Sequence, residues 1–118
     1  MISWIKGELI SSWVDNRKSY VLINCFGLGY EIQTIKLIYK DPHYSELVLW
    51  LEHLKREEKD LLFGFENKEQ RDFFRVLIGI KGIGPQISMT ILNAYSLKEL
   101  MFELLKQNKD LFTNVPGI

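Results

Sequence analysis

The sequence predicts an α+β protein in which a β-rich half precedes an all-α half. Residues 1–64 consist of short runs of β-branched and aromatic residues separated by turn-forming residues, at the spacing of a small five-stranded barrel. Residues 65–118 instead carry apolar residues at helical spacing. The change of period near residues 64–67 therefore predicts two domains, a barrel over 1–64 and a helical domain over 65–118.

The strands expected in the first half are separated by clear turn signals. The segment "MISWIKGELISSWV" is followed by "NRK", and the glycines of "FGLG" divide residues 19–35 into two strands at a tight hairpin or bulge. Residues 44–54 and 61–66 complete the set, with the charged segment "KREEKD" between them. Residues 35–44 are compatible with a short helix that ends at Asp41-Pro42.

Three helices are expected in the second half, and each has a residue that suits its start. Asn67 is a good N-cap, with Gln70 at the capping-box position. Pro85 stands where the first turn of the second helix is expected, the place in a helix where proline is best tolerated. Ser96 suits the start of the third helix, "LKELMFELLKQ", with Glu99 at the capping-box position.

Composition and cysteine usage exclude several classes of protein. The chain has 118 residues, of which 47% are hydrophobic and 25% charged, as in an ordinary globular protein. No apolar run reaches the roughly 18–20 residues that a membrane helix needs, and Lys6 and Glu8 argue against a signal peptide. The single cysteine, Cys25, excludes an internal disulfide and a Cys-rich zinc site. We therefore expect a cytoplasmic protein without a membrane partner.

The charge balance limits how the chain can bind nucleic acid. It has 15 basic and 15 acidic residues, hence no net charge. Nucleic-acid binders usually have a basic excess or a basic stripe. If DNA is the partner, it must be bound through the placement of particular groups.

The segment "KGIGPQI", residues 81–87, is the first candidate binding element. Its glycines permit a close approach of the backbone, and the helix that follows presents amide groups and the positive end of its dipole. Together these features form a cradle for phosphate that reads no base, and Lys81 adds a charge beside it. A plain turn between two packed helices explains the same residues equally well.

A second copy of this pattern favours the phosphate cradle. The tail "VPGI" places Gly117 35 residues after Gly82, and each of these glycines is followed by isoleucine. A repeated two-helix unit is the simplest explanation. Two such hairpins would grip both strands of a duplex across one groove.

Several separated motifs resemble the RuvA family. "KGIGPQISMTIL" and "NVPGI" are similar to its paired helix-hairpin-helix motifs, "MISWIKGELI" to its first strand, "GLGYEI" to its second hairpin, and "LLFGFENKEQRDFF" to its join between barrel and helices. The resemblance covers all 118 residues in order. It implies a five-stranded OB-fold barrel followed by an all-α helix-hairpin-helix domain.

The resemblance also implies a function. RuvA-like proteins are non-catalytic DNA-binding subunits that present Holliday junctions to the ATP-driven motor RuvB for branch migration, in homologous recombination, DNA repair and the SOS response to DNA damage. The implied assembly is a homotetramer, possibly two tetramers, with the resolvase RuvC as a further partner. RuvB is contacted through a C-terminal domain that we expect this chain to lack, and we expect its second hairpin to be truncated. No cofactor is expected, because only the partner motor uses ATP.

The residues that the resemblance assigns to the DNA backbone lie in the two hairpins. Gln86 stands where the family usually has a lysine, so backbone amides are expected to carry most of the phosphate contact. The implied DNA-binding residues are Lys81, Gly82, Ile83, Gly84, Gln86, Pro116 and Gly117.

The charged segment "KREEKD" has three interpretations. It is a solvated turn, or, with His53 and Asp60 nearby in sequence, a poor Mg²⁺ site. By resemblance, Glu57 and Glu58 form an acidic pin whose carboxylates repel DNA phosphates at the centre of the tetramer.

Residues beside the pin complete the implied site. Lys55 and Arg56 flank the acidic pair, and Arg56 is expected to hold a displaced phosphate or base. No metal site and no catalytic residue are expected, and the chain lacks the P-loop motif of nucleotide hydrolysis. The alternatives are a metal-dependent helix-hairpin-helix nuclease or glycosylase, and a protein-interaction barrel without a nucleic-acid role.

Overall fold

The computed structural model describes residues 1–36 and 46–106. Contacts divide the chain into two compact units, Met1–Arg71 and Asp72–Ile118. The short helix suggested for residues 35–44 falls almost entirely outside the described residues. The domain limits predicted from the sequence, 1–64 and 65–118, stay a prediction.

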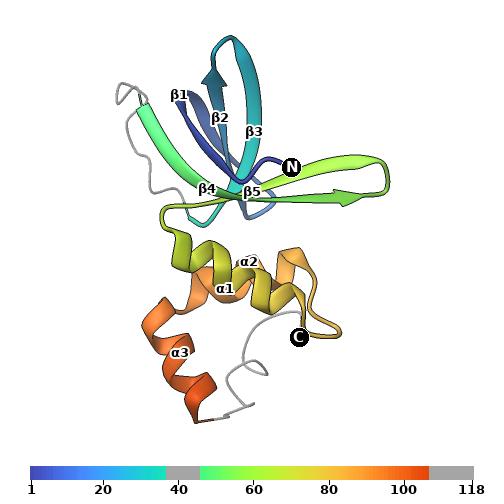
Figure 1. The fold of residues 1–118 in the computed structure, drawn as a ribbon, viewed down its shortest axis with the longest axis vertical. Coiled ribbons are helices and arrows are strands. Elements are labelled where there is room, and N and C mark those ends of the chain that lie inside the picture. The colour runs from blue at the N-terminus through green and yellow to red at the C-terminus, as the bar shows by residue number, and fades with distance from the viewer. Residues whose placement is uncertain (37–45, 107–118) are drawn as a thin grey trace. The chain divides into compact units, whose positions relative to one another are not determined.

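The first unit contains a closed barrel of five strands (Figure 1). Their order around the barrel is β1-β2-β3-β5-β4, and every neighbouring pair is antiparallel except β3 and β5. This arrangement confirms the predicted fold class, a five-stranded OB-fold barrel followed by helices. The strands are β1 (Trp4–Asp15), β2 (Lys18–Cys25), β3 (Leu28–Thr34), β4 (Glu46–Arg56) and β5 (Lys59–Phe65).

The long strand β1 closes the barrel by pairing with two partners. Its first part, Trp4 to Glu8, pairs with β4, and its second part pairs with β2. A register shift between Leu9 and Ser11 marks a bulge, which bends the strand between these two partners. The inward-facing apolar side chains of four strands form the barrel core: Ile5, Leu9, Val21, Ile23, Ile32, Leu49 and Leu51.

Arg71, the last residue of the first unit, connects strand β4 to the segment that precedes β1. Its side chain is buried, with the residue only 5% exposed. The guanidinium Nη1 donates to the carbonyl oxygens of Ser3 and Leu51, each at 3.2 Å, and the group lies over the Trp50 ring at 5.3 Å. One planar donor group therefore connects the start of the chain to β4.

Substitution of Arg71 should weaken the barrel. We expect Arg71→Ala to lower the free energy of unfolding by about 2–4 kcal/mol, because it removes hydrogen bonds from buried carbonyls and uncovers Trp50. Arg71→Lys should recover less than half of this loss, since an ammonium lacks the planar fork. Urea denaturation of the three proteins measures both values. Full recovery by lysine would show that charge alone is required.

Between residue 65 and residue 106, the last one described, the structure contains three helices, as predicted. They are α1 (Lys68–Ile78), α2 (Pro85–Ala94) and α3 (Leu97–Leu105). The buried apolar side chains of the second unit come from all three: Phe73, Phe74, Leu77, Met89, Ile91, Leu92 and Leu100. None of these helices is long and apolar enough to cross a membrane, which holds for all residues that the structure describes.

The predicted helix caps are present, one of them in part. Ser96 and Glu99 form the complete capping box, with the Ser96 Oγ accepting from the Glu99 amide at 3.1 Å and the Glu99 Oε1 accepting from the Ser96 amide at 3.2 Å. The Asn67 Oδ1 accepts from the Gln70 amide at 2.9 Å. The return bond of this box is not formed, because the Gln70 Oε1 is buried without a hydrogen-bond partner.

Candidate nucleic-acid interface

The turn between α1 and α2 is closed by a backbone hydrogen bond and contains two glycines with different structural roles. The Ile83 amide donates to the Ile80 carbonyl at 3.0 Å, which closes the bend. Gly82 has a φ of +89°, a left-handed conformation that side chains other than glycine adopt only with strain. Gly82 is therefore required by the turn itself.

Gly84 is not required by the backbone conformation. Its φ of −94° and ψ of −178° are extended values that any residue adopts. A Cβ built on Gly84 would meet no atom within 4 Å, so neither packing nor conformation explains the glycine. The missing side chain leaves open space directly at the start of α2, where another molecule can approach the backbone.

The first backbone amides of α2 have no capping side chain, in contrast to those of α3. Its N-cap residue is Gly84, which provides no side-chain hydrogen bond, and its first turn contains no acidic residue. In contrast, α1 and α3 have Glu69 and Glu99 in their first turns, and α3 has its complete capping box. The positive end of the α2 dipole is therefore open to an anion from outside.

The remaining predicted residues of this hairpin lie around the same turn. Lys81 and Gln86 are exposed, and Ile83 is partly buried. Lys81 places a positive charge within the turn that precedes the α2 start. The predicted residues of the second hairpin, Pro116 and Gly117, lie outside the described residues, so their pairing with this turn stays a prediction.

The second predicted element lies at the end of a long hairpin formed by β4 and β5, which reaches beyond the other strands of the barrel (Figure 1). Glu57 and Glu58 form its two-residue turn between the paired residues Arg56 and Lys59. Their φ angles are 48° and 67°, both left-handed, as a type I′ turn requires. Such turns favour Asn and Gly, so two glutamates here cost about 1–2 kcal/mol each. Strain of this kind is commonly kept at functional sites.

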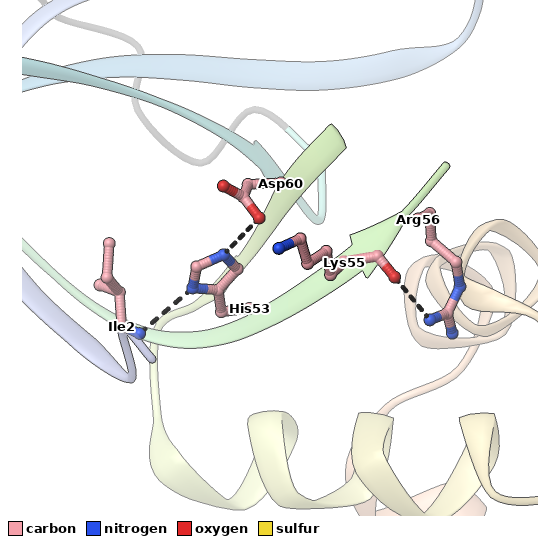
Figure 2. A network of polar contacts seen from close by, with 5 residues as sticks. All are labelled: Ile2, His53, Lys55, Arg56 and Asp60. Atoms are coloured by element: carbon pink, nitrogen blue, oxygen red, sulfur yellow. Dashed lines mark hydrogen bonds and ion pairs between the residues drawn. The ribbon is translucent and has the colours of Figure 1, made fainter. Parts of the chain in front are cut away.

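The two carboxylates are fully available to a partner. Both residues are exposed, and neither carboxylate makes a hydrogen bond or ion pair with any residue in the described part of the chain. Arg56, predicted to flank them, turns back along the strand, where its Nη1 donates to the Lys55 carbonyl at 3.2 Å (Figure 2). The turn therefore presents two carboxylates without ion-pair partners among the described residues, although the cationic residues Arg56 and Lys59 flank them.

The structure does not favour the alternative Mg²⁺ site. Among residues 1–36 and 46–106, no group of three or more His, Cys, Asp and Glu side chains is placed to hold a metal ion. His53 and Asp60, the other members of the considered site, contact each other at 3.3 Å.

His53 joins separate segments of the chain, a role that the sequence did not predict. Figure 2 shows its imidazole between the backbone of Ile2 and the Asp60 carboxylate. Two diagonal positions on paired strands bring His53 and Asp60 together, because His53 lies opposite Leu62 and Asp60 lies opposite Lys55. Only the strand register, which the sequence does not state, reveals this contact.

Two of the three tryptophan rings are already in contact with other side chains, whereas Trp4 is exposed. Trp13 already stacks on Tyr20, with ring centroids 5.6 Å apart and planes 15° from parallel. Trp50 is partly buried, and the Arg71 guanidinium lies over its ring. Trp4 is 47% exposed.

The matching family model and the similar proteins all indicate the same family. Residues 1–64 match the family model described as the RuvA N terminal domain. The chain is 50% identical over 123 aligned residues to a Prochlorococcus marinus subsp. pastoris protein named Holliday junction branch migration complex subunit RuvA, covering 100% of this chain and 56% of that protein. A protein of the same name from strain MIT 9215 is 46% identical, with 100% and 55% covered. The chain spans about half the length of the curated relatives it matches.

Proposed function

Because the chain belongs to the RuvA family, we propose that it is a non-catalytic subunit that binds four-way DNA junctions and presents them to a motor for branch migration. The observation that carries the proposal is the open start of α2. Gly84 has no conformational or packing requirement there, and no side chain of its own caps the helix. A DNA phosphate supplies the anion that this helix start lacks. Because such contacts read no base, binding should follow DNA shape rather than sequence.

The acidic turn has the opposite role in this proposal. Glu57 and Glu58 face phosphates at the crossover, and their repulsion keeps the backbones apart and assists strand separation. At contact distance, like charges repel by roughly 1 kcal/mol in water and by several times that where water is excluded. Lys55 and Arg56 beside the turn hold displaced strands.

The assembly that suits both elements is a homotetramer, alone or as a pair of tetramers, around the four arms of a junction. Within it, phosphate-binding turns grip the arms while four acidic turns meet at the crossover. The motor RuvB uses the ATP, and the subunit itself needs neither metal nor cofactor. RuvC is the partner that resolves the junction.

A gel-shift comparison tests the proposal. A four-way junction and a duplex of the same sequences are titrated with the chain at several salt concentrations. We expect the chain to bind the junction more tightly than the duplex and to leave the DNA uncleaved in Mg²⁺. Affinity should fall with salt concentration, and the slope should give the number of phosphates neutralised. Light scattering of the complex should give multiples of four chains. Equal binding of duplex and junction by a monomer would contradict the proposal, and cleavage lost in Glu57→Gln would indicate a nuclease.

A further inference from the structure

At the base of the β4–β5 hairpin, the imidazole of His53 on β4 contacts the start of the chain and strand β5. The His53 Nδ1 accepts a hydrogen bond from the backbone amide of Ile2 at 3.3 Å, and the His53 Nε2 lies 3.3 Å from the Asp60 Oδ1 (Figure 2). The His53 side chain is only 20% exposed, whereas that of Asp60 is 65% exposed. The ring thus links the start of the chain, β4 and β5.

These contacts define the protonation state of the ring. A backbone amide can only donate, so the Nδ1 that faces Ile2 must carry a lone pair and no proton. In the neutral ring the proton then resides on Nε2, which donates it to Asp60. Only the neutral Nε2–H tautomer satisfies both contacts.

The surroundings of the ring contain few other charges. Asp60 faces it from β5, Lys55 lies on its own strand two residues further along, and the ammonium of Met1 precedes Ile2. None of these groups can replace the imidazole as an acceptor for the Ile2 amide, because the two cations only donate and the Asp60 carboxylate is engaged on the Nε2 side.

The hairpin beyond this point depends on its root. Residues 55–60 are exposed throughout, and they pair only with each other, through Lys55 with Asp60 and Arg56 with Lys59. An isolated two-stranded hairpin is marginally stable in water. The Ile2 segment is itself anchored, because the Leu51 amide donates to the Ser3 carbonyl at 2.9 Å. The direction of the hairpin is therefore determined by contacts at its base.

We propose that His53 is a positioning residue that links the start of the chain to the base of the β4–β5 hairpin and thereby orients the turn of Glu57 and Glu58. The link itself rests on the contacts of the His53 ring with Ile2 and Asp60. Its consequence for a bound junction rests on the proposed function, in which loss of the link would let the two carboxylates move away from the crossover.

Nuclear magnetic resonance of the free 118-residue chain tests the link without DNA, so the result is independent of whether the chain binds junctions. Long-range nitrogen–proton correlation should show the Nε2–H tautomer of His53 at about pH 8, with an Overhauser contact between its ring and Ile2. The order parameters of the Glu57 and Glu58 amides should be about 0.8 in the unmodified protein. The Nδ1–H tautomer of His53, or the absence of an Overhauser contact between its ring and Ile2, would overturn the proposal.

Three variants separate positioning from general stability. His53→Asn keeps an acceptor oxygen near the Nδ1 position, so the hairpin should stay ordered. His53→Phe removes both polar contacts, so the order parameters of the Glu57 and Glu58 amides should fall toward about 0.6. His43→Asn, which changes the other histidine of the chain, should behave as the unmodified protein. An ordered hairpin in His53→Phe would contradict the proposal even if the fold were intact.

Discussion

Gly84→Ala should abolish most junction binding while leaving the protein folded. The added methyl group meets no atom within 4 Å and the backbone is already extended, so the free energy of unfolding should change by less than about 0.5 kcal/mol. The same methyl group occupies the space through which a phosphate approaches the α2 amides. Loss of one charge-assisted hydrogen bond, worth roughly 1.5–3 kcal/mol, corresponds to at least a tenfold rise in Kd. Gel shift and thermal unfolding of the same sample measure the two effects.

Two control variants distinguish loss of the phosphate site from the general effect of adding a methyl group. Gly82→Ala, two residues earlier, forces alanine into a left-handed φ of +89° and should lower stability by about 1–2 kcal/mol. Gly29→Ala adds a methyl group in the barrel at 3.4 Å from a flexible Leu22 side chain and should change neither property appreciably. If Gly84→Ala bound junctions as tightly as Gly29→Ala, the helix start would not be the phosphate site.

Replacement of the acidic turn should make the protein both more stable and a tighter binder. Glu57→Asn combined with Glu58→Gly introduces the residues that a type I′ turn favours, so we expect a gain of about 2–4 kcal/mol in the free energy of unfolding. Removal of two charges that face phosphates should also lower the junction Kd by roughly fivefold at low salt. Strand separation in a motor-driven assay should be impaired.

Charge and turn strain can be separated. Glu57→Gln combined with Glu58→Gln removes the charges but keeps side chains of the same shape in the left-handed turn. It should tighten junction binding as much as the Asn-Gly variant, without the gain in stability. The advantage in affinity should disappear at high salt, since screening removes repulsion between exposed charges. As a stability control, Arg17→Gly relaxes the equivalent position of the β1–β2 turn, where Arg17 has a φ of 66°. Unchanged low-salt affinity in the Gln pair would exclude repulsion as the role of the turn.

Local signals in the sequence predicted most of the fold. The Ser96 and Glu99 spacing, the position of Pro85 and the change from β-rich runs to helical spacing depend on neighbours along the chain, and the structure confirms the elements they predicted. The Gln70 half of the first capping box was wrong, because its oxygen is buried without a partner. The orientation of the Gln70 side chain depends on its buried surroundings, which residue spacing in the sequence does not describe.

The candidate sites were harder to predict in detail. The spacing of the glycines indicated a turn, but not that Gly82 serves conformation whereas Gly84 leaves open space. The contact of His53 with Ile2 joins residues 51 positions apart and requires the closed barrel to exist first. Such long-range contacts depend on strand register, and two isolated histidines in a sequence carry no information about it.

The closure of the barrel restricts how copies of the chain can join. A sheet with a free edge can extend itself by pairing with the edge of another molecule, and this pairing tolerates most side-chain changes because it uses the backbone. In the ring β1-β2-β3-β5-β4 each strand has neighbours on both sides, and unpaired backbone remains over parts of strands, such as residues 55–60 of the β4–β5 hairpin. Assembly around a junction would therefore depend largely on side chains, and single substitutions at the surface should be able to convert an assembled protein into separate, folded chains.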